Sequence, residues 1–175
     1  MNEVMKNILS RRSIRSFQQR QIADEELNQI LEAGNFAPSA MNQQSWYFAA
    51  VQDRELMDSL RGSAQEFLRN PGTDPFYGAP TVIFVFGDKS AIAPVADASL
   101  AIENMFLSAW SLGIGSCWVN FVGRFFESPS SQPFREKFGV PDGYQCVGSA
   151  ILGYIDGDIP EAKPRRGGNI RIIRS

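Results

Sequence analysis

The chain has 175 residues, of which 43% are hydrophobic and 21% charged, and its net charge is -2 at pH 7. This length and composition indicate a globular protein, and we expect one domain over residues 1–175. A slightly acidic chain has no general attraction to nucleic acid or to anionic membranes. No apolar run is long enough for a signal peptide or a transmembrane helix. We therefore expect a cytoplasmic protein without nucleic-acid or membrane partners.

Histidine is absent from the sequence, which excludes Ser-His-Asp and Cys-His catalytic machinery. The two cysteines, Cys117 and Cys146, lie in apolar segments, and we expect them to be buried free thiols. Two thiols are too few for an ordinary zinc site, so no metal is predicted. The chemistry of an enzyme with this composition is expected from carboxylates or from a bound organic cofactor.

The N-terminal part combines a short apolar helix, predicted over residues 3–10, with a basic cluster. Arg11, Arg12, Ser13 and Arg15 follow that helix directly. Guanidinium groups and hydroxyls match the oxygens of a phosphate, which favours an anion site. Spacing alone is equally typical of a solvated basic turn, so the cluster leaves both readings open.

A second helix and a polar loop come next. Asp24 is predicted to cap the helix, whose apolar positions have helical spacing. Pro38 ends it, and residues 38–46 form a loop of small residues and amides. Such loops usually satisfy their own backbone groups, but their amides also suit a heteroaromatic ring or a ribityl chain. The loop alone does not decide between these functions.

The middle of the chain predicts an alternation of strands and helices. We expect a strand over 46–51, an amphipathic helix over 54–69 and a central strand over 81–86. The loop between the last two is rich in Gly, Pro and aromatic residues, a composition typical of a mobile or partner-contacting loop.

The segment 97–112 is the most informative element. It is apolar almost all the way round, so we expect a helix that runs through a core or a subunit interface. Gly113 and Gly115 end it, and residues 116–119 read as a short buried strand. A buried helix that leads into a strand is typical of mixed α/β or α+β domains.

The last part predicts an aromatic, irregular segment over 120–129, a helix over 130–138 and a strand over 146–154. Gly148 and Gly153 in that strand indicate close backbone approach to the long helix or to a ligand. The tail carries Lys163, Arg165 and Arg166 before a terminal strand predicted over 170–173. The two basic clusters at opposite ends of the chain are either unrelated patches or two sides of one phosphate site.

Five motifs, taken in order, resemble those of the nitroreductase family of FMN-dependent flavoproteins, and they span nearly the whole chain. They are RRSIRSF (11–17), APSAMNQQSW (37–46), DASLAIENMFLSAWSLGIGSCWV (97–119), GVPDGY (139–144) leading to LGY (152–154), and PRR (164–166).

The resemblance implies an α+β fold in which helices wrap a central, mostly antiparallel sheet. It also implies an intertwined homodimer with two FMN sites at the subunit interface. The long helix would then lie against its partner, and the terminal strand would extend along the neighbouring subunit.

The resemblance assigns cofactor contacts to four groups of residues. The FMN phosphate and ribityl chain would be held by the N-terminal group, with Arg15 reaching the pyrimidine edge, and by the tail. The isoalloxazine ring would be lined by the loop at residues 38–42 of the other subunit, and the segment 117–120 would lie beside the ring. These residues are Arg11, Arg12, Ser13 and Arg15; Lys163, Arg165 and Arg166; Pro38, Ser39, Ala40 and Asn42; and Cys117, Trp118, Val119 and Asn120, with Asn70 as a weaker candidate.

Three positions depart from the family pattern. Ser45 stands where proline usually precedes the tryptophan, and Gly167-Gly168 follows the arginines where proline and leucine are common. Asn120-Phe121 replaces small or acidic residues, and the bulk of Phe121 is expected to narrow the substrate space.

The resemblance implies an oxidoreductase that takes hydride from NAD(P)H at flavin N5 and passes it to a nitroaromatic or quinone by a ping-pong cycle. No catalytic side chain is then required. The alternatives are a flavin-holding or redox-sensing module with little turnover, and a specialised relative that carries out flavin fragmentation or reductive dehalogenation.

Overall fold

A four-stranded antiparallel sheet forms the centre of the protein, in a computed structural model that describes residues 1–174. The strand order is β1-β2-β4-β3. The strands are β1 (Trp46–Val51), β2 (Thr81–Asp88), β3 (Ile114–Val119) and β4 (Tyr144–Tyr154). The predicted α+β class with an antiparallel sheet is confirmed, and β2 occupies the interior position expected of its continuous apolar run.

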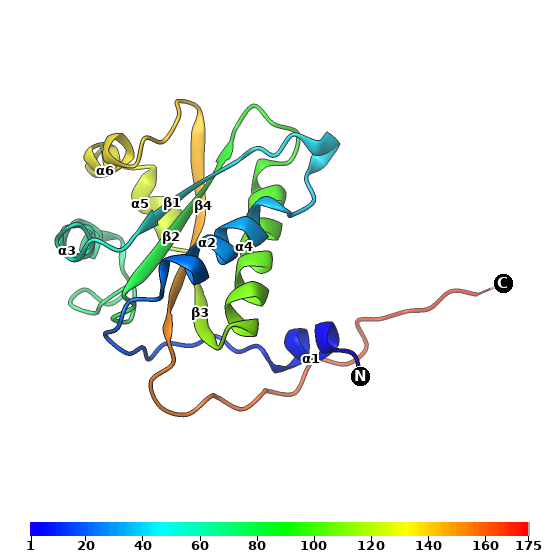
Figure 1. Cartoon of the computed structure of the whole chain (residues 1–175). Coiled ribbons are helices and arrows are strands. Elements are labelled where there is room, and N and C mark those ends of the chain that lie inside the picture. Colours follow the sequence, from blue (N-terminus) through cyan, green and yellow to red (C-terminus); the bar gives the residue numbers. More distant parts are fainter. Residues whose placement is uncertain (175) are drawn as a thin grey trace.

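Alternate residues of β2 point to two different cores, since successive side chains of a strand face opposite sides. Val82, Phe84 and Phe86 belong to a core rich in phenylalanine, with residues of α3 (Arg54–Ser63), α5 (Val122–Phe126) and α6 (Gln132–Lys137). Ile83 and Val85 face the other core, built with α2 (Asp24–Asn35) and α4 (Pro94–Ser111). Helices therefore cover both faces of the sheet (Figure 1).

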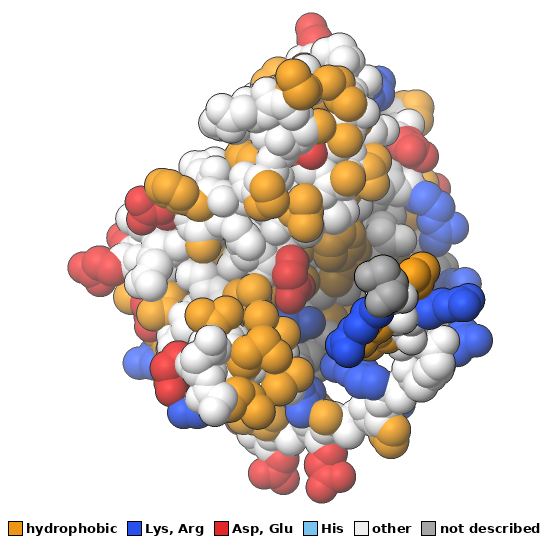
Figure 2. Space-filling view, turned by 90° about the vertical axis from the view of Figure 1, so that its right-hand side faces the viewer, with side chains coloured by type: hydrophobic (Ala, Val, Ile, Leu, Met, Phe, Trp, Pro, Cys, Tyr) orange, Lys and Arg blue, Asp and Glu red, His pale blue; other side chains and the backbone are white. Residues whose placement is uncertain are grey.

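The long helix α4 begins at Pro94, three residues earlier than predicted, because proline fits the first helical position without losing a hydrogen bond. One side of it is buried, but Val95 and Leu100 are exposed by 53% and 46%. The short helix α1 (Glu3–Ser10) packs near the other end of α4 and contains no buried residue. Exposed apolar side chains thus gather on this side of the molecule (Figure 2).

Several predicted boundaries were wrong. Ala23 rather than Asp24 stands at the N-cap of α2, where its N–H donates to the Glu26 carboxylate at 2.8 Å. Helix α3 ends at Ser63, six residues early, and the chain turns through the 3₁₀ segment Gln65–Phe67. The turn is held by the Gln65 amide, which donates to the Thr73 carbonyl at 3.3 Å.

The segment 120–129, predicted to be irregular, contains α5 and part of the 3₁₀ segment Pro129–Ser131. Val122, Phe125 and Phe126 are buried, and they stand at the i, i+3, i+4 spacing of one helix face. That spacing was the signal in the sequence for a short helix.

The two glycines of β4 make close approaches, but to neither of the predicted partners. A Cβ on Gly148 would lie 2.7 Å from the Trp118 ring, and one on Gly153 would lie 2.8 Å from Pro80. The absence of a side chain at 148 therefore makes room for Trp118, on the neighbouring strand.

The head of the chain, residues 14–18, pairs with β3 and with the end of β4 at one edge of the sheet. The Ile14 N–H donates to the Ser116 carbonyl (2.9 Å), and the Gln18 N–H donates to the Tyr154 carbonyl (2.9 Å). Residues 155–174 then run past α1 as an extended, largely exposed segment (Figure 1).

The strand predicted over 170–173 is not formed within the described residues. A strand requires a hydrogen-bonding neighbour, and this single chain provides none there. Nor does any described helix have the length and apolarity that a membrane span requires.

Candidate functional site

The basic segment after α1 is held against α4 and β3. The Arg11 guanidinium lies 5.4 Å from the centre of the Phe106 ring, with its Nε 3.6 Å from a carboxylate oxygen of Glu103. One terminal nitrogen of Arg12 donates to the carbonyls of Leu9 (2.9 Å) and Arg11 (2.8 Å). These contacts hold the start of the segment in place.

Two buried polar atoms beside this segment have no hydrogen-bond partner among the described residues: Arg12 Nε and Ser116 Oγ. They lie on adjoining stretches of chain, since Ser13 pairs with Ser116 in a parallel bridge. A buried donor without an acceptor is costly, and such groups are rare unless a ligand or water satisfies them. Arg12 Nε is therefore a hydrogen-bond donor that still needs an acceptor among the described residues.

A cavity of about 410 Å³ lies in front of β3, and it contains five of the predicted residues. We call it the Trp118 cavity. Its predicted lining residues are Arg15, Asn70, Trp118, Val119 and Asn120, and the others are Leu68, Arg69, Thr73, Asp74, Pro75, Tyr77 and Phe121. Three segments that lie far apart in sequence, at Arg15, 68–77 and 118–121, are thus brought together around one cavity.

Arg15 reaches this cavity from the head segment. Its side chain is exposed, and the guanidinium carbon lies 5.7 Å from the centre of the Tyr77 ring. No carboxylate of the described residues lies within ion-pair distance of Arg15. A cation above an aromatic face, without a counterion, is available to an electron-rich or anionic partner.

The segment 68–77 also lines the Trp118 cavity, and apart from Asn70 it was not predicted as part of a site. Asp74 organises it, because its carboxylate accepts from the N–H groups of Phe76 (2.9 Å) and Gly78 (2.6 Å) and from Arg61 Nε (3.1 Å). Tyr77 is held in a left-handed conformation, with φ of 55°. The Asp-Pro sequence was the available signal, since aspartate at a turn bonds the backbone that follows it.

The loop that contains Pro38, Ser39, Ala40 and Asn42 lies elsewhere on the molecule. It packs on the first turn of α4 through Asp97, whereas α1 meets the last turns through the Asn7 amide, which donates to the Leu107 carbonyl (2.8 Å). A helix rises about 1.5 Å per residue, so these two contacts are roughly 15 Å apart along α4. One chain does not bring the loop onto the Trp118 cavity (Figure 1).

The tail residues Lys163, Arg165 and Arg166 are exposed. Figure 2 shows Lys and Arg side chains gathered on the face past which the tail runs. Cys117, by contrast, is buried at 2% exposure in β3 and contributes no side chain to the Trp118 cavity. Its predicted role is therefore limited to the backbone of the strand.

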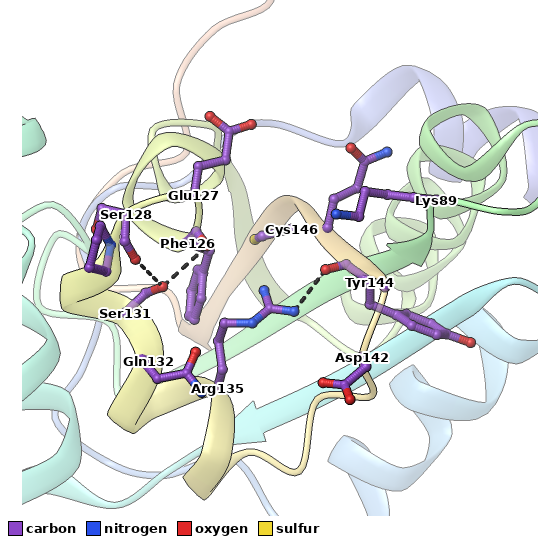
Figure 3. A pocket seen from close by; sticks show the side chains of 13 residues that line it. Lys89, Phe126, Glu127, Ser128, Ser131, Gln132, Arg135, Asp142, Tyr144 and Cys146 are labelled. Atoms are coloured by element: carbon purple, nitrogen blue, oxygen red, sulfur yellow. Dashed lines mark hydrogen bonds between the residues drawn. The ribbon is translucent and has the colours of Figure 1, made fainter.

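A second cavity, of about 470 Å³, lies between α6 and the start of β4 and is lined by Cys146 and by none of the predicted cofactor residues (Figure 3). We call it the Cys146 cavity. A terminal nitrogen of Arg135 donates to the Tyr144 carbonyl at 2.7 Å. Burial raises the pKa of the Cys146 thiol, well above its usual range. A thiol that stays protonated is a poor nucleophile.

Comparisons with known proteins agree with this geometry. The sequence model described as "Nitroreductase family" matches residues 8–154. A protein of Archaeoglobus fulgidus, provisionally named NADH dehydrogenase/NAD(P)H nitroreductase, is 36% identical over 88% of this chain and 86% of its own length. A Bacillus subtilis protein, whose name is FMN reductase with NAD(P)H as the reductant, is 30% identical over 94% of this chain and 70% of its own length.

Solved structures give the same result. A nitroreductase from Bacteroides fragilis, crystallised with bound FMN, has a TM-score of 0.92 and 34% identity, and the match covers 99% of this chain and 100% of that one. The fold and the cavity define a flavoprotein-like α+β domain. The chain belongs to the nitroreductase family.

Proposed function

We propose that this protein is an FMN-dependent oxidoreductase that passes hydride from NAD(P)H to an electron-poor acceptor such as a nitroaromatic or a quinone. The observation that carries the proposal is the Trp118 cavity, which joins the uncompensated Arg15 to the backbone of β3. The relatives named for FMN and NAD(P)H support it.

The residues present fit an FMN molecule. Arg12 Nε is a buried donor without an acceptor, and phosphate oxygens are acceptors. In the proposal, Arg11, Arg12 and Ser13 hold the phosphate and ribityl chain with Lys163, Arg165 and Arg166 of the tail. Arg15 faces the pyrimidine edge of the ring, while Trp118, Val119 and Asn120 pass beside it.

The proposed assembly is a homodimer in which each chain completes the other's site. Exposed apolar residues on α1 and α4 support this, because side chains such as Val4 (65% exposed) and Leu9 (52%) are costly to leave in water when they are adjacent. The loop residues Pro38, Ser39, Ala40 and Asn42 would then reach the partner's flavin. Residues 170–173, with Ile172 70% exposed, would form their strand on the partner.

No side chain of the cavity is needed as an acid or base. When bound, FMN supplies the hydride chemistry, at its N5 atom. The chain's own task is to bind and orient the ring, to stabilise negative charge on its pyrimidine edge through Arg15, and to leave one ring face open. In the same proposal, residues 1–175 form one domain, and the two free thiols suit the reducing cytoplasm.

The test begins with the visible spectrum of the purified protein before and after FMN is added. We expect a yellow protein that oxidises NADH or NADPH steadily when menadione or a nitrofuran is present. Protein that stays colourless with FMN would refute the proposal.

A module that holds flavin with little turnover is the second candidate. Phe121 favours it, since this side chain lines the cavity and packs 6.0 Å from the Phe76 ring centre, which leaves less room for an acceptor. A yellow protein that fails to oxidise either nicotinamide with any acceptor of the panel would support this candidate over the first.

A further inference from the structure

Asp97 is a buried carboxylate in the first turn of α4, with only 3% of its surface exposed. One oxygen accepts from the Ala40 N–H at 3.0 Å, and the other accepts from the Ser45 hydroxyl at 3.2 Å. No described Lys or Arg lies within ion-pair distance of it. A buried charge needs compensation, and here it comes from these two donors and from the positive end of the helix.

The segment between those two donors is strained. Met41, Asn42 and Gln44 all have positive φ values, of 53°, 55° and 48°. Such conformations are uncommon for residues other than glycine, and they persist only when the surroundings determine them. Asp97 bonds the residue just before this run and the residue just after it, so its carboxylate acts as a clamp on residues 40–45.

Ser45 carries half of the clamp, because its hydroxyl is the donor to the second oxygen of Asp97. The side chain of Ser39 adds a tie inside the loop, because its hydroxyl accepts from the Gln44 N–H at 3.0 Å. The loop is thus shaped from within by Ser39 and fixed to α4 by Asp97.

We propose that Asp97 and Ser45 are positioning residues, which set the geometry with which the loop 38–44 contacts the flavin ring of the partner subunit. The inference rests on the proposed function, because it requires a bound flavin for its effect on the site. Neither residue touches the ring in this proposal. Their influence reaches it through Ser39, Ala40 and Asn42.

Asn104 provides a matched control on the same helix. Its amide donates to the Ala33 carbonyl at 3.0 Å and ties α4 to α2, away from the loop. Asn104→Ala therefore removes a side-chain-to-backbone bond of similar length without touching the clamp. A purely structural role for Asp97 predicts that Asp97→Ala and Asn104→Ala have the same kind of effect.

The first measurement uses the protein without FMN. Amide hydrogen exchange at Ala40 should be about tenfold faster in Asp97→Ala, since a charge-assisted bond is lost. It should change less than about twofold in Asn104→Ala. Unchanged exchange at Ala40 in Asp97→Ala would overturn the clamp.

The second measurement uses the protein loaded with FMN. We expect Asp97→Ala to shift the visible flavin spectrum and to raise the Kd for FMN about tenfold, and Ser45→Ala to raise it about threefold. Asp97→Asn keeps an acceptor for Ala40 and should restore most of the wild-type spectrum. These two milder variants keep the test decisive if Asp97→Ala does not fold.

The failure of the proposed function can be distinguished from the failure of the positioning role. Wild-type protein that binds no FMN refutes the proposed function, and the positioning role falls with it. Wild-type protein that binds FMN, together with an Asp97→Ala spectrum and Kd equal to those of Asn104→Ala, refutes the positioning role alone.

Discussion

The Trp118 cavity and the Cys146 cavity differ in how Arg15 and Arg135 are bonded. The Cys146 cavity is the larger, at about 470 Å³ against 410 Å³, but its arginine is bonded to the Tyr144 carbonyl. The Trp118 cavity has a cation, Arg15, that lies over the Tyr77 ring without a carboxylate partner. Volume alone therefore does not select the functional cavity, and the proposal places the flavin at the smaller one, where Arg15 lies beside the end of β3.

The largest effect is expected from the tail, because the phosphate end of the site depends on cations outside the Trp118 cavity. Arg165→Ala with Arg166→Ala removes two charge-assisted contacts and should raise the Kd for FMN about 10- to 100-fold. The affinity for riboflavin, which has no phosphate, should stay unchanged. Titration of flavin fluorescence measures both.

The matched control for the tail is Lys137→Ala with Arg174→Ala, which removes the same charge from exposed positions outside the proposed phosphate site and outside the strand proposed over 170–173. An equal loss of FMN affinity in the control would mean that general charge attraction, rather than a phosphate site, holds the cofactor.

Arg15 and Arg135 allow a direct comparison of the cavities. Arg15→Ala should lower kcat/KM about tenfold or more with little change in Tm, because this side chain is exposed and lies over the Tyr77 ring. Arg135→Ala should instead destabilise the fold by about 1 kcal/mol, through the lost bond to the Tyr144 carbonyl, and leave turnover intact. If Arg135→Ala instead lowered kcat/KM and Arg15→Ala only destabilised the fold, the active site would lie at the Cys146 cavity.

Phe121 tests how the Trp118 cavity selects its acceptor. Phe121→Ala opens space beside Phe76 and should raise the rate with bulky acceptors about tenfold, at the low end of the effect of one methylene group in an apolar pocket. Menadione and a larger quinone can be compared in the same assay. If both acceptors respond equally, Phe121 does not restrict the substrate space.

Cys146 should have the smallest effect on activity. Because burial raises its pKa, the folded chain keeps the thiol proton to a higher pH than the unfolded chain does. The contribution of the protonated Cys146 thiol to the free energy of unfolding is fully present at neutral pH. It is lost as the pH rises above about 8.5, where the thiol of the unfolded chain ionises. Cys146→Ala should therefore turn over normally and lose less stability than the wild type between pH 7 and 9.5.

Urea unfolding at the two pH values measures this difference. A Cys146→Ala variant with greatly reduced turnover would place chemistry in the Cys146 cavity and contradict the comparison.

Much of the fold could be predicted from local patterns. The strand Trp46–Val51 was predicted to the residue, and β2 was placed correctly at the interior of the sheet, because continuous apolar runs read directly as buried strands. The helix α5 was missed because its three buried residues lie within five positions, where aromatic density hid the helical spacing.

The site was harder to predict because it depends on loops. The roles of Asp74 and Tyr77 arise when the loop after α3 folds back on its own carboxylate. Asp97 looked like a polar break in an apolar helix, and only the structure links it to Ala40 and Ser45. Such links join distant segments, and local periodicity carries no information about them.

The central claim is that each flavin is held between two copies of this chain, with two flavins in one dimer. Analytical ultracentrifugation, with absorbance recorded at both the protein and the flavin wavelengths, tests it most directly. The account predicts a dimer that carries one FMN per chain, and loss of flavin wherever dilution separates the chains. A single chain that sediments alone with FMN bound would contradict it.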